Sequence, residues 1–460
     1  MRKFLLLVAA LGCLARSAVA VELHGLPPDA LALWAGPVEG DGTLAEWRAD
    51  APVSPASTMK LLTSWAALDR LGPDFTWRTT LVSDAGVVDG VLQGDLYWVG
   101  QGDPRFFADR LQALIDQLRE RGIRRIAGRL VLDGSAYRSI PPVDGFESDG
   151  GEGFMVPPDP LLTNLNMVWL RYFNDGNGVR VAMEPPLAGV LLDNRLEDGG
   201  VGNGACPDVR RYANAVFEGG RIVVRGRLPR SCDGATSYLQ TLAPRAFAAA
   251  AFSGMWQRSG GEGPVAAADG SAPVGARVLA AVDSDPLSRV LPDMNKFSSN
   301  PMARSLYLTM GRLAASGDDT TADAERAVQQ TLAAHGLSDR GLVLENGSGL
   351  SRRAQLSARL LGQVLREAAR GPYGSEFMAS LPVAGETGTL KRRFADIGAR
   401  LRLKTGTLRN VAALAGYWLA PDGRRLVIVA IVNHSDAAAS KPALDAVVRD
   451  VIRQAQQSGI

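Results

Sequence analysis

The stretch STMKLLTSWAALDRL, Ser57–Leu71, contains the first candidate site residues. Apolar residues recur along it at near-helical spacing, and Gly72-Pro73 ends the pattern, so the stretch predicts a helix. Ser57 and Lys60 stand three residues apart at its start, which places both side chains on one face about a turn from each other. A buried lysine loses proton affinity through desolvation, and a helix N-terminus favours developing negative charge. The pair therefore predicts a serine activated by a lysine.

Lysine is rare in this chain, which makes its presence in the helix informative. Among 50 basic residues, lysine stands only at Lys3, Lys60, Lys296, Lys391, Lys404 and Lys441. Arginine does not deprotonate in proteins, so a lysine kept here indicates a need for a titratable amine. Chance alone predicts about 0.4 Ser-x-x-Lys matches in such a composition, so the motif needs companions.

Two companions follow in the chain, Ser298-Ser299-Asn300 and Lys404-Thr405-Gly406. Ser-x-Asn arises by chance nearly once, and it can simply cap the helix predicted to begin near Pro301. Lys-Thr-Gly is expected only about 0.03 times, and it lies at the edge of a predicted strand, where glycine lets another backbone come close. The order Ser-x-x-Lys, Ser-x-Asn, Lys-Thr-Gly indicates the serine acyl-transfer site of penicillin-binding proteins and class A β-lactamases.

Composition excludes several other classes of protein. The 460 residues predict several domains, and 50 basic residues against 48 acidic ones argue against a nucleic-acid partner. The histidines, His24, His335 and His434, lie far apart without metal-ligand spacing, and the chain lacks a G-x-S-x-G elbow. We therefore expect no metal, no cofactor and no Ser-His-Asp triad.

The N-terminus resembles a secretory signal over residues 1–20, with cleavage after Ala20. A membrane anchor is the alternative, but the apolar run is shorter than the ~20 residues needed to span a bilayer. A lipid anchor on Cys13 is a second alternative. We expect an exported, periplasmic protein with at most peripheral membrane contact. Because an exported protein meets an oxidising environment, we expect a disulfide between Cys206 and Cys232, and two buried free thiols are the alternative.

The pattern of predicted secondary structure divides the rest of the chain into regions. Residues 75–285 show short strands, turn dipeptides and one predicted helix at 107–121. We therefore predict that this stretch is inserted into the domain formed by the sequence on either side of it. Around it we expect strands at 30–36, 43–48, 401–407, 411–419 and 426–433, and helices at 57–71, 300–317, 321–335, 356–371 and 443–456.

With these motifs the chain resembles the D-alanyl-D-alanine carboxypeptidase/endopeptidase family of low-molecular-mass class C penicillin-binding proteins, peptidase family S13. The 241 residues between Ser57 and Ser298 leave room for that family's inserted domains, whereas β-lactamases have a much shorter gap. Further matches are VLDGSAY (131–137), PLLTNLNMV (160–168), NGSGLSR (346–352), LPVAGETGTLKRRF (381–394) and KTGTLRNVAALAGYW (404–418). Asn346, where the family commonly has Asp, Arg304, near a commonly acidic position, and Pro301 depart from the pattern.

The resemblance implies roles for the motif residues. Ser57 would be the acylated nucleophile and Lys60 its base. Ser298, assisted by Lys404, would relay a proton to the leaving amine, and Asn300 would hold the substrate amide.

It also implies a substrate-binding edge. Backbone N–H groups of Ser57 and Thr407 would form an oxyanion hole, and Thr405, beside Gly406, would join Thr407 in binding the terminal carboxylate. Arg352 and Asp133 would contact the side chain of the stem peptide. As alternatives, Arg352 pairs with a surface carboxylate and Asp133 caps a turn.

The resemblance implies an α/β (α+β) fold. It has a transpeptidase core like those of penicillin-binding proteins and β-lactamases, with an antiparallel sheet flanked by helices and two inserted, mainly β domains. The predicted division is a signal peptide at 1–20, a catalytic domain at 21–78 and 280–460, inserted domain II at 79–100 and 176–279, and inserted domain III at 101–175.

The implied activity is that of a serine D-Ala-D-Ala carboxypeptidase or D,D-endopeptidase on peptidoglycan stem peptides, with β-lactams as covalent inhibitors. Two alternatives stay open: a β-lactamase on the same core, and a catalytically silent cell-wall binding module.

Overall fold

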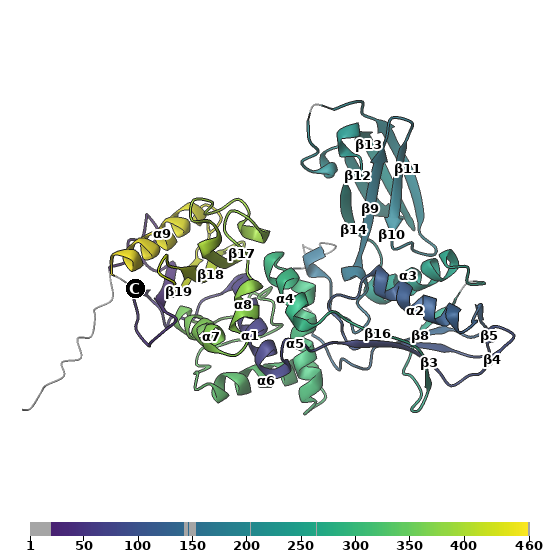
Figure 1. Ribbon diagram of the computed structural model, residues 1–460, viewed down its shortest axis with the longest axis horizontal. Coiled ribbons are helices and arrows are strands. Elements are labelled where there is room, and N and C mark those ends of the chain that lie inside the picture. Colours follow the sequence, from purple (N-terminus) through teal and green to yellow (C-terminus); the bar gives the residue numbers. More distant parts are fainter. Residues whose placement is uncertain (1–19, 142–145, 147–152, 203, 264, 459–460) are drawn as a thin grey trace, which may run out of the picture.

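The computed structural model describes residues 20–141, 146, 153–202, 204–263 and 265–458. The expected signal sequence, including Cys13, lies outside the described residues except for Ala20. Within the described ranges, no helix combines the length and apolar character needed to cross a bilayer. Figure 1 shows one lobe around β17–β19 and α9, a second around β3, β8 and β16, and a third, with β11–β13, that projects from the second.

The first lobe is built on a five-stranded antiparallel sheet in the order β17-β18-β19-β1-β2. Its strands β18 and β19 read VAALAGYWL and RLVIVAIVN, nearly continuous apolar runs that bury both faces of the sheet. The bounds are β1 (Leu31–Pro37), β2 (Ala45–Trp47), β17 (Leu401–Leu408), β18 (Val411–Leu419) and β19 (Arg425–Asn433).

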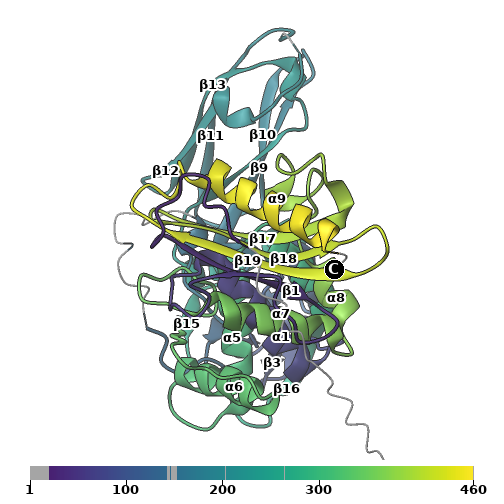
Figure 2. The same cartoon turned by 90° about the vertical axis from the view of Figure 1, so that its left-hand side faces the viewer.

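Helices cover both faces of this sheet, as Figure 2 shows with α9 on one side and α1, α5 and α7 on the other. Alternation along β1 explains the two layers: Leu31 and Leu33 pack with the apolar face of α9, whereas Trp34 packs with α1 and α7. The helices are α1 (Met59–Leu71), α4 (Leu287–Lys296), α5 (Asn300–Ala314), α6 (Thr320–Ala334), α7 (Ala358–Arg370), α8 (Gly374–Ala379) and α9 (Lys441–Gln457). Short 3-10 turns are η1 (Ala56–Thr58), η3 (Gly153–Met155), η4 (Asn164–Asn166), η5 (Val209–Arg211), η6 (Arg230–Cys232), η7 (Gly388–Leu390) and η8 (Gly398–Arg400).

The second lobe holds a five-stranded sheet in the order β15-β8-β6-β3-β16, against which α2 and α3 pack. A small sheet, β4-β5-β7, lies beside it. The bounds are β3 (Arg78–Ser83), β4 (Val87–Val88), β5 (Val91–Leu92), β6 (Leu96–Val99), α2 (Ala108–Glu120), β7 (Arg125–Ile126), β8 (Leu130–Asp133), α3 (Pro244–Arg258), β15 (Ala267–Asp269) and β16 (Arg277–Asp283).

The third lobe consists of two three-stranded sheets, β10-β9-β14 and β11-β13-β12. Cys206 and Cys232 form a disulfide there, with a Cα–Cα distance of 5.0 Å. The predicted domain limits stay predictions, and the limit at 175/176 falls between β9 and β10, which pair as antiparallel neighbours. The bounds are β9 (Met167–Asn174), β10 (Val179–Glu184), β11 (Leu191–Asp198), β12 (Ala213–Glu218), β13 (Arg221–Leu228) and β14 (Thr236–Gln240).

One sequence expectation for the insertion was wrong. The pattern predicted a single helix there, at 107–121, and α2 occupies 108–120, but α3 is a second helix of the described insertion. Its sequence, PRAFAAAAFSGMWQR, has apolar residues on all sides and therefore shows no helical period. The structure buries Phe247, Phe252 and Trp256 from this helix in the core of the second lobe.

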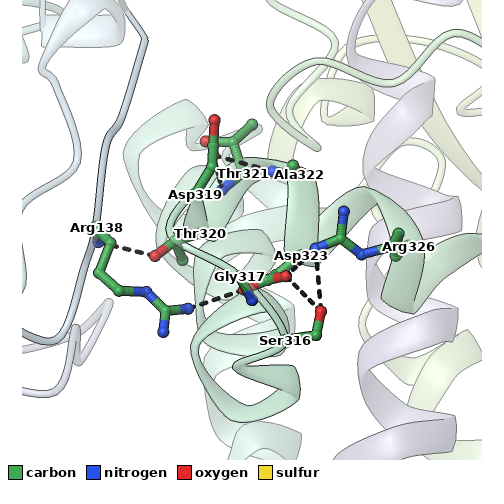
Figure 3. A network of polar contacts seen from close by, with 9 residues as sticks. All are labelled: Arg138, Ser316, Gly317, Asp319, Thr320, Thr321, Ala322, Asp323 and Arg326. Atoms are coloured by element: carbon green, nitrogen blue, oxygen red, sulfur yellow. Dashed lines mark hydrogen bonds and ion pairs between the residues drawn. The ribbon is translucent and has the colours of Figure 1, made fainter.

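A buried carboxylate on α6 connects the segment after β8 to the first lobe (Figure 3). Asp323 on α6 is fully buried, and it accepts hydrogen bonds from Arg138 Nη2 at 2.8 Å and Ser316 Oγ at 2.6 Å. The backbone N–H of Arg138 donates to Thr320 Oγ1 at 2.8 Å, and the Arg138 carbonyl accepts from the Thr320 N–H. Asp319 caps the same helix end by accepting from two backbone N–H groups. The first turn of α6 thus fixes the position of the segment around Arg138, which follows β8.

Asp103, in the loop after β6, gives the first testable prediction. Burial raises the pKa of its carboxyl to about 7, and the nearby backbone N–H of Arg105 opposes this only in part. Since the folded pKa lies above the ordinary value of 3.8, the folded state binds the extra proton, and stability falls as the pH rises from about 4 to about 7. We expect urea titrations to show that Asp103→Asn has a free energy of unfolding roughly 2–4 kcal/mol higher than the wild type at pH 8. At pH 4 the two proteins should differ little. An equal difference at both pH values would contradict this account.

Candidate active site

Ser57 and Lys60 meet at the point where η1 passes into α1. Lys60 is fully buried, and its Nζ donates to Ser57 Oγ at 3.1 Å. Burial, and next the charge of Lys404, hold the pKa of Lys60 well below its usual value of 10.5. A neutral amine in this place can accept the hydroxyl proton, as a general base must.

Two further acceptors orient the Lys60 amine: Asn300 Oδ1 at 2.6 Å and the Ser348 carbonyl at 2.7 Å. The sequence did not single out Ser348, although it lies in the NGSGLSR match. Asn346 fixes this loop, because its Oδ1 accepts from Ser348 Oγ at 2.8 Å and its Nδ2 donates to the Leu350 carbonyl at 2.8 Å. A carboxylate could not make that second bond, so the asparagine side chain supplies a donor that an aspartate in its place would lack.

Ser298 and Lys404 form a second hydroxyl–amine pair. Lys404 Nζ donates to Ser298 Oγ at 2.8 Å and to the Thr405 carbonyl at 2.7 Å. Lys404 is fully buried, and burial lowers its pKa to about 7. Ser298 has a φ of 58°, and Ala56, directly before Ser57, has a φ of 45°. Both serines are thus presented from backbone conformations that L-residues seldom adopt, which is common at functional sites.

Two glycines let neighbouring chains approach the nucleophile. A Cβ on Gly406 would lie 2.7 Å from the Pro55 carbonyl oxygen, so the Lys-Thr-Gly strand passes η1 at backbone distance. A Cβ on Gly349 would lie 1.8 Å from the Ala56 carbonyl oxygen. The close packing of β17 and the 346–350 loop against η1 therefore fixes the position of Ser57.

Substitution of Gly349 should test this packing. We expect Gly349→Ala to lower the free energy of unfolding by roughly 2–4 kcal/mol and to slow reaction of Ser57, because Ala56 must move. Gly341→Ala is the matched control: its φ of 76° is nearly that of Gly349, at 75°, but the nearest atom to its Cβ, in Pro52, is 3.7 Å away. The control should lose only about 1–2 kcal/mol and keep its activity. Equal losses in both variants would refute the steric role of the Ala56 contact.

A cavity of about 520 Å³ opens over these groups. It is lined by Ser57, Phe146, Phe154, Ser298, Asn300, Gly349, Leu350, Arg352, Thr407, Leu408 and Arg409. Asn300 Nδ2 donates to the Phe154 carbonyl at 3.2 Å, which holds this wall against α5. The two phenylalanines were not foreseen, because a lone aromatic residue in a loop carries no sequence signal.

The remaining predicted residues occupy different places. Thr407 lines the cavity, while Thr405 Oγ1 donates to Thr389 Oγ1 at 2.8 Å. The guanidinium of Arg352 lies 4.1 Å from the centre of the Phe146 ring, at the cavity. Asp133 is not among the residues that line it: its carboxylate accepts from backbone N–H groups of Ser135 at 2.9 Å and Ala272 at 2.8 Å. This matches the turn-capping alternative.

The departures in α5 are accommodated locally. Pro301 lies in the first turn, where its missing N–H costs nothing, and Ser299 Oγ caps the helix by accepting from the Met302 N–H. Arg304, one turn after Asn300, is buried and donates to the Val156 carbonyl at 3.3 Å. Its pKa is lowered to about 10 by burial. Asn300 and Arg304 thus hold two carbonyls of one short segment, those of Phe154, which lines the cavity, and Val156.

Comparisons with known proteins agree with this geometry. Residues 17–453 match the model of the D-Ala-D-Ala carboxypeptidase 3 (S13) family. The chain is 30% identical over 403 residues to a D-alanyl-D-alanine carboxypeptidase of Actinomadura sp. (strain R39), covering 84% of this chain and 74% of that protein. It is 26% identical over 400 residues to the D-alanyl-D-alanine carboxypeptidase DacB of Haemophilus influenzae, covering 85% of this chain and 82% of that one.

Solved structures show the same fold. Penicillin binding protein 4 of Haemophilus influenzae superposes with a TM-score of 0.73 at 24% identity, covering 92% of this chain and 96% of that one. A predatory peptidoglycan endopeptidase of Bdellovibrio bacteriovorus gives a TM-score of 0.54 at 16% identity, covering 95% and 94%. These likenesses confirm the predicted mixed α/β core with its antiparallel sheet flanked by helices. With three motifs gathered at one cavity and a family match over nearly its whole length, the chain belongs to the S13 family of D-Ala-D-Ala carboxypeptidases.

Proposed function

We propose that this protein is a serine D-Ala-D-Ala carboxypeptidase and D,D-endopeptidase that cleaves peptidoglycan stem peptides and their cross-links through an acyl-enzyme on Ser57. The observation that carries the proposal is the buried Lys60 amine at 3.1 Å from Ser57 Oγ, in the same cavity as Ser298. Named relatives in the family are D-alanyl-D-alanine carboxypeptidases, and one structural neighbour is a peptidoglycan endopeptidase.

The acylation step begins at the first hydroxyl–amine pair. Neutral Lys60 removes the proton of Ser57 as its oxygen attacks the carbonyl carbon of the penultimate D-Ala. The resulting oxyanion would be held by the backbone N–H groups of Ser57 and Thr407, a device worth about 3–4 kcal/mol per donor where measured. Asn300, which also accepts a hydrogen bond from Lys60, would hold the substrate amide.

Collapse of the tetrahedral intermediate needs a proton on the leaving nitrogen. Ser298 gives its proton to that nitrogen and is resupplied by the Lys404 ammonium, which donates to it at 2.8 Å. Thr405 and Thr407 would bind the terminal carboxylate of a carboxypeptidase substrate. Before deacylation Lys60 passes the proton taken from Ser57 to solvent, and Lys404 regains one from solvent. Water then attacks the ester carbonyl while Lys60 takes a proton from that water, and Lys60 returns this proton to Ser57 Oγ as the ester C–O bond breaks and the shortened peptide leaves.

The cavity wall also offers a specificity element. Arg352, which stacks on Phe146, is positioned to meet a carboxylate on the side chain of the stem peptide. Asp133 is left out of this proposal because both its carboxylate oxygens serve backbone N–H groups. We further propose that the protein acts outside the cytoplasm, where its substrate lies and where the Cys206–Cys232 disulfide persists.

The test is the reaction of the purified protein with benzylpenicillin. We expect one stable penicilloyl adduct, and peptide mapping should place it on Ser57. Fast turnover of a chromogenic cephalosporin without a lasting adduct would indicate a β-lactamase, and no reaction at all would indicate a silent wall-binding module. Release of D-Ala from a pentapeptide and cleavage of a cross-linked muropeptide then measure the two peptidase activities separately.

A further inference from the structure

A second cavity, of about 470 Å³, lies in the inserted lobes, away from Ser57. The residues that line it come mainly from α2, the end of α3 and the strands β9 and β10. Figure 1 shows these elements where the third lobe joins the second. Its volume is within the range of about 300–1,000 Å³ that small-molecule sites occupy. The lining residues are Phe107, Ala108, Asp109, Gln112, Asn164, Trp169, Glu184, Met255 and Arg258.

Three aromatic rings run through this cavity and onto the surface beside it. Trp169 lies at the centre: its ring is 5.8 Å from that of Phe107 and 5.9 Å from that of Tyr238. Tyr238 as a whole residue is 59% exposed. Within the described part of the chain, no residue accepts a hydrogen bond from the indole N–H of Trp169. The row therefore offers apolar faces together with polar donors, the combination that suits ligands with both C–H faces and hydroxyl groups.

The charges of the cavity indicate the class of ligand. Arg258 on one wall is already paired with Glu184, through contacts of 2.9 Å and 3.2 Å. Gln112 Nε2 donates to Ser259 Oγ at 2.8 Å, which fixes the amide at the edge of the site. The remaining charged lining residue, Asp109, is exposed and negative. Together these groups disfavour phosphates and other anions and favour a neutral ligand rich in hydroxyl and amide groups.

We propose that this cavity and the Trp169–Tyr238 surface bind the glycan strand of peptidoglycan, a chain of β-linked N-acetylated amino sugars. The inference rests on the proposed function, because a wall peptidase meets its stem peptides attached to such strands. Pyranose rings would lie on the aromatic faces, and their hydroxyl and acetamido groups would meet the Trp169 N–H and the polar edge. The insertion would then hold the polymer while the catalytic lobe works on its peptides.

The experiment measures binding of two peptide-free probes to the full protein: chitohexaose, and glycan strands stripped of peptide by an amidase. Titration calorimetry and a change in the intrinsic tryptophan fluorescence should both report binding, and the fluorescence change should be absent in Trp169→Ala. We expect Trp169→Ala to weaken it at least tenfold and Tyr238→Ala to weaken it several-fold. Phe173→Ala is the matched control, since Phe173 lies on the same strand but does not line the cavity, and it should bind as the wild type does.

A second readout separates this inference from the proposed function. Penicillin acylation and D-Ala release from a soluble pentapeptide should be unchanged in Trp169→Ala and Tyr238→Ala, whereas cleavage of intact sacculi should fall. Wild-type protein that binds neither probe, or variants that bind both as the wild type does, would overturn the glycan site. If penicillin does not acylate the wild-type protein, the proposed function is overturned instead. If Trp169→Ala fails to fold, the exposed Tyr238→Ala decides the outcome.

Discussion

Replacing Lys60 with arginine should lower the rate of Ser57 acylation by about 10²–10⁴-fold or more, the usual contribution of a general base. Arginine keeps the positive charge but cannot give up its proton, so Ser57 Oγ would face a permanent donor instead of an acceptor. The pKa of Lys60 lies well below the ordinary value because of burial and the nearby Lys404. Lys60 can therefore be neutral in its buried position, whereas the guanidinium of an arginine there would stay charged.

Two companion variants make the Lys60 result specific. Lys60→Met removes the amine without burying a charge, so it should fold at least as well as the wild type and yet be equally slow. Lys441→Arg, at the start of α9, makes the same chemical change far from the cavity and should have no effect. Acylation would be followed by the mass increase with penicillin, and folding by thermal denaturation. A Lys60→Met variant that reacts within about tenfold of the wild type would show that another group takes the proton.

Substitution of Lys404 should change the shape of the pH profile as well as the rate. With a pKa of about 7, Lys404 loses its proton, and its donor role toward Ser298, as the pH rises through neutrality. In the free enzyme kcat/KM should therefore fall above about pH 7. The Lys404 charge also lowers the pKa of Lys60, so Lys404→Ala should raise that pKa and move the acid limb of the profile to higher pH. We expect a loss of about 10²–10³-fold in kcat/KM with it.

Lys404→Arg is the matched variant for this pH effect. It retains a positive charge that does not titrate, so the acid limb should stay where it is and the alkaline limb should disappear, whatever the level of activity. The measurement is kcat/KM for D-Ala release between pH 5 and 10. Identical profile shapes for the alanine and arginine variants would show that the Lys404 charge does not act on Lys60.

Much of the catalytic lobe could be predicted from the sequence because its elements obey simple periods. The apolar runs of β18 and β19 match strands buried on both faces, and the near-helical spacing of apolar residues in α1 matches a helix packed in the core. The three motifs lie on or beside these elements. In the insertion the same rule failed for α3, since a helix buried on all sides has no polar face to set its period.

The parts of the site that were missed depend on contacts far apart in the chain. The Ser348 carbonyl reaches Lys60 across 288 residues, and no local pattern marks a carbonyl as an acceptor. The same holds for Phe154, whose carbonyl is held by Asn300 across 146 residues. Motif order could identify the amines and hydroxyls, but the backbone groups that orient them are set by tertiary packing.

The position of β1 in the central sheet has a consequence for biosynthesis. This strand lies between β2 and β19, and Leu33 pairs with Ala430. Among the described strands β1 is synthesised first and β19 last, so β1 is made long before this partner. Until β19 is made, the edge of β1 that will face β19 has no paired strand, and unpaired strand edges of this kind recruit other chains. The insertion, with an apolar cluster of its own, can settle earlier during synthesis. We therefore expect that a chaperone which shields β1 during synthesis raises the yield of active protein. Faster folding of the inserted lobes should raise the yield less, because it would leave β1 exposed.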